Sequence, residues 1–160
     1  MKKLKRCLLF VTFGFYCLVL VYLLFLNRGY QFERQQDFSE YIRYAVNLIP
    51  FKTLTELFAR NAERSINTDI VFDNAVGNFL LFSPMGIYLP SLRKKVRKIG
   101  RFVFFIFLTV LTVESLQLLL CVGSFDVDDI MLNMAGAIAG YGIWKTRVIQ
   151  KLLRTIQWLR

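Results

Sequence analysis

The chain of 160 residues contains no histidine and only three cysteines and three prolines. Without histidine, Ser–His and Cys–His catalysis are excluded, and a zinc site is disfavoured because imidazole is one of the main zinc ligands. Cys7, Cys17 and Cys121 all lie in apolar stretches. We interpret them as small apolar side chains rather than as a disulfide framework, and we expect neither a metal nor a cofactor.

Polar residues are also scarce, since 56% of the chain is hydrophobic and only 20% is charged. Soluble domains average about 45–50% apolar residues, and a domain this short buries only about two-thirds of its chain surface. A water-soluble fold could not cover so much apolar surface. The composition therefore predicts an integral membrane protein.

Four apolar segments mark candidate crossings of a bilayer. They are residues 7–26, 74–92, 102–122 and 130–144. A crossing helix needs about 20 residues, so we expect the short fourth segment to continue towards Ile149 while Lys145 and Arg147 snorkel. A basic head precedes the first segment, but no small-residue cleavage site follows it, which favours an uncleaved anchor. Pro84 predicts a kink in the second segment.

The basic residues are distributed on one side of these segments. The N-terminal head, the loop 93–101 and the tail from Lys145 together hold 15 of the 21 Lys and Arg and no acid. By the positive-inside rule, both termini are then cytoplasmic. Because the positive charge borders the spans, we expect it to contact an anionic inner leaflet rather than nucleic acid. The fold class is an all-α, polytopic membrane helical bundle with about four transmembrane helices.

Two polar segments complete the predicted organisation. In residues 27–73, which we place outside the cell, Thr53-x-x-Glu56 predicts a capping box that opens an amphipathic helix. We expect one or two short helices there against the outer membrane surface. The domains expected are an anchor (1–26), an extracytoplasmic loop (27–73), a three-helix core (74–144) and a basic amphipathic cytoplasmic tail (145–160).

Carboxyl and amide side chains lie near the outer end of the last three spans. They are Asn78, Glu114, Gln117, Asp126, Asp129 and Asn133. Glu114 and Gln117 share one helix face, and Asp129, Asn133, Gly136 and Gly140 form one stripe. Gly136-x-x-x-Gly140 permits close backbone contact. We expect this stripe to face the third span, which would bring all the polar side chains into one pocket.

Plainer interpretations exist for most of these residues. The two asparagines are also typical of hydrogen bonds between helices, and the aspartates at 126, 128 and 129 are typical of a solvated turn with a helix N-cap. Glu114 differs, because a carboxylate inside a span costs several kcal/mol unless it is paired, protonated or hydrated. It is therefore a functional candidate.

The order and spacing of these motifs resemble the VanZ-like membrane protein family. The motifs are Asn47-Leu-x-Pro50-Phe51, Asn78 to Pro90 with Pro84 and Gly86, Glu114-x-x-Gln117, and Asp126-x-x-Asp129-x-x-x-Asn133-x-x-Gly136-x-x-x-Gly140. Many members carry an Arg shortly before the first Asp, where this chain has Gly123-Ser124-Phe125. The resemblance implies a multi-pass bacterial membrane protein, and some members raise resistance to lipid-anchored glycopeptides such as teicoplanin.

These lines together favour one hypothesis and leave three alternatives. In the first, the pocket recognises the polar part of a membrane lipid or cell-wall precursor. In the second, Glu114 and Asp129 act as acid and base in an enzyme of lipid headgroups. The third is a proton- or ion-coupled transporter that uses Glu114, and the fourth is a structural or assembly protein.

Overall fold

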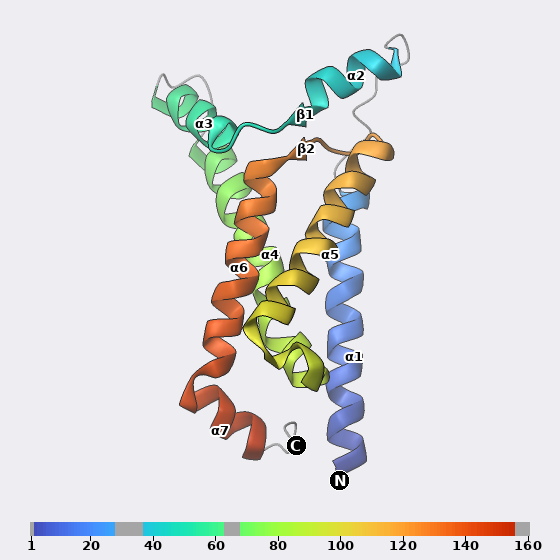
Figure 1. Ribbon diagram of the computed structural model, residues 1–160, viewed down its shortest axis with the longest axis vertical. Coiled ribbons are helices and arrows are strands. Elements are labelled where there is room, and N and C mark those ends of the chain that lie inside the picture. Colours follow the sequence, from blue (N-terminus) through green and yellow to red (C-terminus); the bar gives the residue numbers. More distant parts are fainter. Residues whose placement is uncertain (1, 28–36, 63–67, 156–160) are drawn as a thin grey trace.

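The computed structural model describes residues 2–27, 37–62 and 68–155. Seven α-helices and two short strands lie within these ranges (Figure 1). They are α1 (Lys2–Val21), α2 (Phe38–Ala45), β1 (Val46–Asn47), α3 (Lys52–Ala62), α4 (Thr68–Leu92), α5 (Ile99–Leu119), β2 (Phe125–Asp126), α6 (Val127–Lys145) and α7 (Arg147–Thr155). A π-helical segment, Tyr22–Leu26, continues α1, and a 3₁₀ turn, Lys94–Arg97, precedes α5. The all-α bundle expected from the sequence is confirmed.

The long helices α1, α4, α5 and α6 run along the length of the molecule, and the short elements lie at its two ends (Figure 1). We call the end that carries α2, α3, β1 and β2 the strand end. The opposite end holds the start of α1 together with α7, and we call it the terminal end. Both ends of the described chain thus lie on one side of the bundle, as an even number of crossings requires.

Three helices in the described ranges are long and apolar enough to cross a membrane. Their apolar parts are Cys7–Leu26, Ala75–Leu92 and Ile99–Leu119. Large apolar side chains such as Phe15 and Phe104 point outward from them and are exposed. Helix α6 is not among the three, and it carries Asp128 and Asp129 in its first turn and Lys145 in its last. The fourth crossing therefore stays a prediction.

The fourth apolar segment does not continue towards Ile149, which corrects the sequence-based expectation. Helix α6 ends at Lys145, and Thr146 adopts an extended backbone with ψ 146°. The Thr146 hydroxyl accepts a long hydrogen bond (3.5 Å) from the Ile149 amide in the first turn of α7. A threonine in this position starts a new helix, because its side chain replaces a missing backbone acceptor.

Two other helix boundaries differ from the predicted ones. Helix α4 begins at Thr68, six residues before the predicted span, and it continues through Pro84. Helix α5 ends at Leu119, because Cys121 has φ 54° and reverses the chain. The Val122 amide donates to the Gln117 carbonyl and the Cys121 amide to Leu118, which is a Schellman motif with cysteine in the usual place of glycine.

The Gly136/Gly140 stripe faces α4 and not α5, contrary to the prediction. A side-chain carbon at Gly136 would collide with the Phe79 carbonyl, and one at Gly140 with the Ser83 carbonyl. Gly86 of α4 is equally close to the backbone of α6. Glycines on both helices therefore let the two backbones touch, and α4 and α6 form the most closely packed pair of the bundle.

Helix α5 packs on this pair through fully buried side chains. Phe102, Ile106 and Val110 follow one another at four-residue spacing and are completely buried. Tyr141 of α6 stacks on Phe102, with 4.7 Å between the ring centroids, and its hydroxyl donates to the Arg97 carbonyl. This contact joins the basic 3₁₀ turn to the core of the bundle.

Candidate functional site

Residues 37–62 are attached to the start of α6 by side chains as well as by strands. β1 and β2 pair in parallel, with Val46 opposite Phe125 and Asn47 opposite Asp126. The Asn47 amide donates to Asp126 Oδ1 (3.2 Å) and to the Thr53 hydroxyl (2.9 Å), and that hydroxyl donates to Asp126 Oδ2. The predicted capping box is therefore wrong, because Thr53 lies inside α3 and uses its hydroxyl to bind Asp126.

Asp128 of α6 caps the N-terminus of α3 in place of the predicted capping box. Its carboxylate accepts from the backbone amides of Phe51 and Leu54, the latter at 3.1 Å. Phe51 has φ 64°, a conformation that costs an ordinary side chain energy. The first amides of a helix lack partners and carry partial positive charge. A buried carboxylate from a distant helix therefore holds α3 in place.

Asp126 has the role that the turn motif predicted, since it is the N-cap of α6. Its side chain accepts from the backbone amide of Asp128 at 2.8 Å. Both residues are nevertheless buried, so this turn is not solvated in the way that a plain surface turn would be. The burial follows from residues 47–54, which bind both carboxylates and cover the turn.

Helices α4 and α6 are also joined by a polar pair. The Asn78 amide donates to Asp129 Oδ1 at the strand end of the two helices. Asn78 is buried and Asp129 is partly buried. Asp129 precedes Gly136 by two helical turns and Asn78 directly precedes Phe79, so the pair lies towards the strand end from the glycine contact. Close helix packing thus positions a carboxylate and an amide together.

Glu114 and Gln117 share a face of α5 as predicted, but they contact different elements. Glu114, only 2% exposed, lies against the start of α6, with its Oε2 3.5 Å from the Asp126 amide nitrogen. Gln117 donates to the Leu24 carbonyl (2.9 Å) at the end of the span that begins with α1. The sequence predicts that Gln117 contacts polar side chains of α6, but Gln117 instead binds the backbone of the segment that continues α1.

Asn133 is the most unusual member of the set. It is 1% exposed, and within the described ranges neither its amide nitrogen nor its oxygen has a hydrogen-bond partner. Within the same described ranges, Gln117 Oε1 is also buried without a hydrogen-bond partner. Buried polar atoms are nearly always paired, and leaving one unpaired costs about 1–3 kcal/mol.

The structure thus groups the predicted residues into pairs. Glu114 lies with Asp126, Asn78 with Asp129, and Asn133 one turn below Asp129 on α6. The residues that the sequence analysis did not select are Asp128, Asn47 and Thr53. Asn47 belonged to a recognised motif and Asp128 to the acidic turn, but nothing local indicated that Asn47 binds Asp126, 79 residues away, or that Asp128 binds Leu54, 74 residues away.

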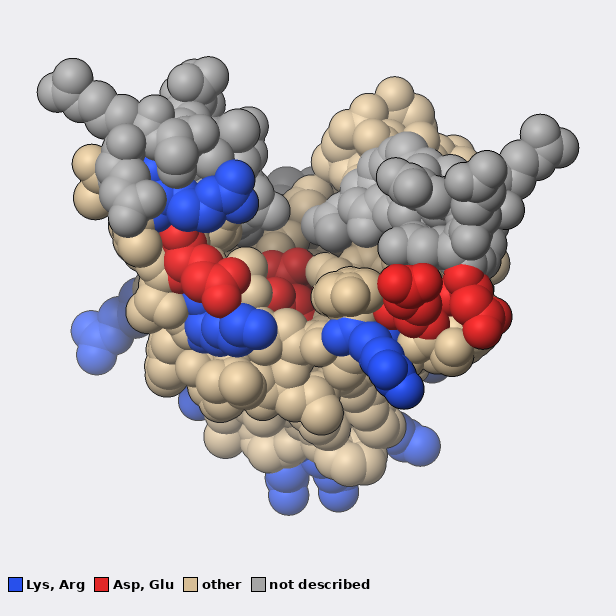
Figure 2. Space-filling view, turned by 90° about the horizontal axis from the view of Figure 1, so that it is seen from above, with Lys and Arg blue, Asp and Glu red and all other residues tan. Residues whose placement is uncertain are grey.

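Figure 2 looks onto the strand end, where acidic side chains are visible near the centre and towards both sides, with Lys and Arg beside them. The face therefore carries hydrogen-bond acceptors and donors side by side. For the part of the chain that the structure describes, no three His, Cys, Asp or Glu side chains converge closely enough to hold a metal ion.

Comparison with known proteins covers nearly all of these elements. The sequence profile of the VanZ/LLP1 family matches residues 13–150, from α1 into α7. Protein VanZ of Enterococcus faecium is 29% identical over 85 residues, which are 51% of this chain and 52% of the relative. The aligned part therefore spans about half the length of that curated relative. No solved structure matches the chain. Since the family profile reaches into all four long helices and includes every residue of the buried polar set, the chain belongs to the VanZ/LLP1 family.

Proposed function

We propose that this protein works in the bacterial cell membrane and raises resistance to lipid-anchored glycopeptide antibiotics such as teicoplanin. It would do so by recognising the polar part of a membrane lipid or cell-wall precursor at the strand end. Family membership and three helices suited to span a membrane support the location. The bacterial relative supports the envelope context.

The observation that carries this proposal is the unpaired amide of Asn133. A membrane bundle could fill this position with leucine, which has a similar size and no polar atoms. Retaining an amide whose donor and acceptor both lack partners in the described structure costs stability. A ligand that offers both an acceptor and a donor would recover that cost on binding.

The acidic surroundings narrow the chemistry of such a ligand. Asp126, Asp128, Asp129 and Glu114 all lie near the start of α6. Ionised carboxylates only accept hydrogen bonds and repel other anions. The recognised part would therefore be rich in hydroxyl, amine or peptide N–H groups and poor in phosphate, as a sugar or a peptide stem is.

The terminal end would contact the opposite leaflet. Lys94 and Lys95 in the 3₁₀ turn, and Arg147 and Lys151 in α7, are exposed there. Basic groups beside a span attract anionic lipids at about 1 kcal/mol each. This attraction would hold the strand end outward, where a lipid-tailed drug and a cell-wall precursor are both accessible.

The experiment that tests the proposal is an Asn133→Leu substitution with two readouts. Expressed in a susceptible bacterium, the unchanged protein should raise tolerance to tailed glycopeptides several-fold more than to untailed ones. Asn133→Leu should abolish most of that gain. In purified protein the same change should increase the free energy of unfolding by up to about 1–3 kcal/mol, because no buried amide is left unpaired.

The two readouts separate a binding amide from a structural one. Met134→Leu is the matched control, since it changes the next residue of α6 without altering its polarity and should leave both readouts unchanged. If Asn133→Leu keeps full tolerance at equal expression, the amide is not the recognition element. A wild-type protein that alters tolerance to neither drug class would reject the resistance role itself.

A further inference from the structure

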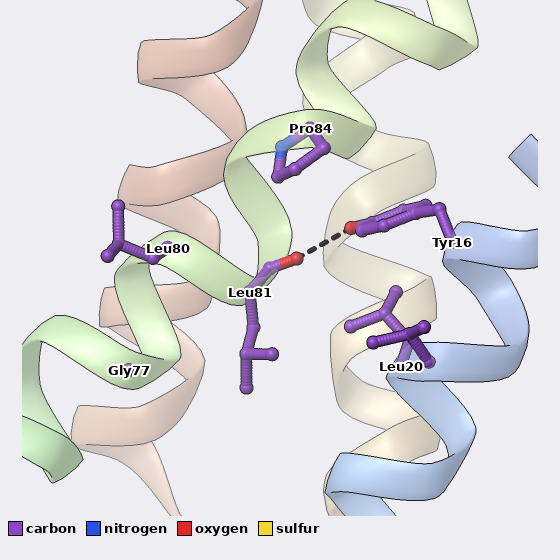
Figure 3. A pocket seen from close by; sticks show the side chains of 7 residues that line it. Tyr16, Leu20, Gly77, Leu80, Leu81 and Pro84 are labelled. Carbon is purple, nitrogen blue, oxygen red and sulfur yellow. Dashed lines mark hydrogen bonds between the residues drawn. The ribbon is translucent and has the colours of Figure 1, made fainter. Parts of the chain in front are cut away.

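An apolar groove of about 270 Å³ opens between α1 and α4 (Figure 3). Its lining includes Tyr16 and Leu20 of α1 and Gly77, Leu80, Leu81 and Pro84 of α4. On each helix these residues recur at three- to four-residue spacing, so they form one face. The lining is almost entirely carbon, because the Tyr16 hydroxyl is turned towards the Leu81 carbonyl (2.6 Å).

The groove exists because side chains of the two helices touch at one end, whereas at the other end a glycine leaves the space between the helices unfilled. Towards the terminal end, Tyr16 stacks on Tyr88 (5.6 Å between centroids), and Phe13 also contacts Tyr88 (5.4 Å). Towards the strand end, Gly77 has no side chain, and a carbon added there would meet nothing within 4 Å. Pro84 has no backbone N–H to donate to the Leu80 carbonyl. The Tyr16 hydroxyl donates to the neighbouring Leu81 carbonyl.

The position of the groove within the spans indicates what surrounds it. Tyr16 and Pro84 lie near the midpoints of the apolar segments Cys7–Leu26 and Ala75–Leu92. Gly77 lies two turns, about 10 Å, closer to the strand end. Half of a hydrocarbon core is about 15 Å thick. The groove therefore faces hydrocarbon and covers most of one leaflet, the one that the charge distribution places outside.

The size of the groove decides between two occupants that hydrocarbon could supply. A helix of a second copy is about 10–12 Å wide with its side chains and could insert no more than single side chains into about 270 Å³. A lipid acyl chain is narrow and unbranched, and it already extends from the headgroup to the midplane. It needs no polar partner, which agrees with the carbon lining.

Polar groups lie beside the end of the groove that is closer to the strand end. Helix α4 runs from the strand end inward, so Asn78 lies one residue deeper than Gly77, and its amide binds Asp129 of α6. On the side of α1, one turn after Leu20 and closer to the strand end, the Leu24 carbonyl accepts from Gln117. A lipid whose chain occupied the groove would thus have its polar part at the strand end, above these buried polar contacts.

We propose that this groove binds one acyl chain of an outer-leaflet lipid and that the lipid's polar part lies at the strand end. The proposal rests on the proposed function only in so far as the same lipid is the ligand of the polar set. It requires no reaction. It assigns the α1–α4 face to lipid binding, whereas the α4–α6 face is used for packing.

The test uses photocrosslinking in vesicles of a phosphate-free diacyl glycolipid that carry a trace of the same lipid with a diazirine in the middle of one chain. Mass spectrometry of the irradiated, purified protein should locate the adducts between Tyr16 and Leu20 and between Gly77 and Pro84. Gly77→Leu, which fills the groove from within, should lower the yield at these sites at least threefold. Gly77→Ala should lower it less, because alanine fills less space.

Gly14→Leu is the matched control. Gly14 also lies on a membrane-spanning helix and has nothing within 4 Å of an added carbon, but it does not line the groove. Its adduct yield in the groove should equal that of wild type. Melting temperatures should show that all three variants fold, because a carbon added at Gly14 or Gly77 meets nothing within 4 Å.

The outcomes separate this inference from the proposed function. Equal yields in wild type and Gly77→Leu, or disulfide-linked dimers through Gly77→Cys in place of lipid adducts, would overturn the groove assignment. Asn133→Leu should lower the groove adducts less than Gly77→Leu does, because it removes a contact with the polar part of the lipid but leaves the groove open. If Gly77→Leu loses the adducts but keeps full drug tolerance, the groove binds lipid independently of resistance, and the shared ligand is rejected.

Discussion

Asp128 shows how much depends on a single buried carboxylate. It accepts from the Phe51 and Leu54 amides and so connects the first turns of α3 and α6. Asp128→Ala should lower the free energy of unfolding by about 1–3 kcal/mol, because it leaves buried amides without a partner. Asp128→Asn should cost less, since one oxygen remains. Thermal unfolding in detergent micelles measures both changes.

The control for Asp128 is Asp37→Asn. Asp37 precedes α2 and is exposed, and it makes no capping bond to that helix. Its substitution should change stability by less than about 0.5 kcal/mol, as is usual for surface sites. If Asp128→Ala is as mild as Asp37→Asn, the docking of α3 does not depend on the carboxylate.

Substitutions of Glu114 and Asp129 distinguish a binding site from an enzyme that uses acid–base chemistry. Glu114→Gln keeps the size of the side chain and one acceptor, so a binding site should retain part of the drug tolerance, whereas an enzyme that needs this carboxyl would lose all of it. If both residues serve one ligand, Glu114→Gln/Asp129→Asn should be hardly worse than the poorer single variant. Additive losses of tolerance, at matched expression, would instead show two independent sites.

At the scale of elements, the α4–α6 pair depends on the absence of side chains. Gly136→Ala should destabilise the protein by about 1–3 kcal/mol, because the added carbon collides with the Phe79 carbonyl. Gly142→Ala in the same helix should be neutral or stabilising by up to about 1 kcal/mol, because nothing lies within 4 Å and alanine is the better helix former. Equal melting temperatures for the two variants would contradict this packing.

At the scale of the whole molecule, the charge distribution predicts which end faces outward. In a variant without the native cysteines, Ala59→Cys in α3 and Ser124→Cys before β2 should react with a membrane-impermeant maleimide on intact cells. Gly100→Cys, which is exposed at the start of α5, should react only after lysis. Lysed cells give the labelling maximum for each site. Labelling of Gly100→Cys in intact cells would reverse the orientation.

The bundle as a whole divides its surfaces by chemistry. The α4–α6 contact uses backbone and glycine, the outward faces of α1 and α5 carry large apolar side chains, and the strand end collects acids and amides. Each surface suits a different environment: protein, hydrocarbon and the polar boundary. In the two proposals above, the apolar side would bind a lipid chain and the strand end would recognise a polar group.

The sequence by itself determined the all-α class, the three apolar spans and the N-cap role of Asp126. These features are local, because a lipid-crossing helix needs only about 20 apolar residues in a row and an N-cap only a carboxylate beside its own helix. The sequence also identified Glu114 and Asn133 as polar residues inside apolar segments. Those predictions did not require knowing which helices are neighbours.

Tertiary structure alone decided which side chains meet. Gly136 and Gly140 face α4 because Gly86 and the backbone of Phe79 and Ser83 offer a matching close approach, whereas helical periodicity places the stripe on a face without naming its partner. Gln117 binds Leu24 across 93 residues, and Asp128 binds Phe51 across 77. Such pairs depend on how whole helices pack, and the free energy of packing belongs to the assembled bundle rather than to any segment of the chain.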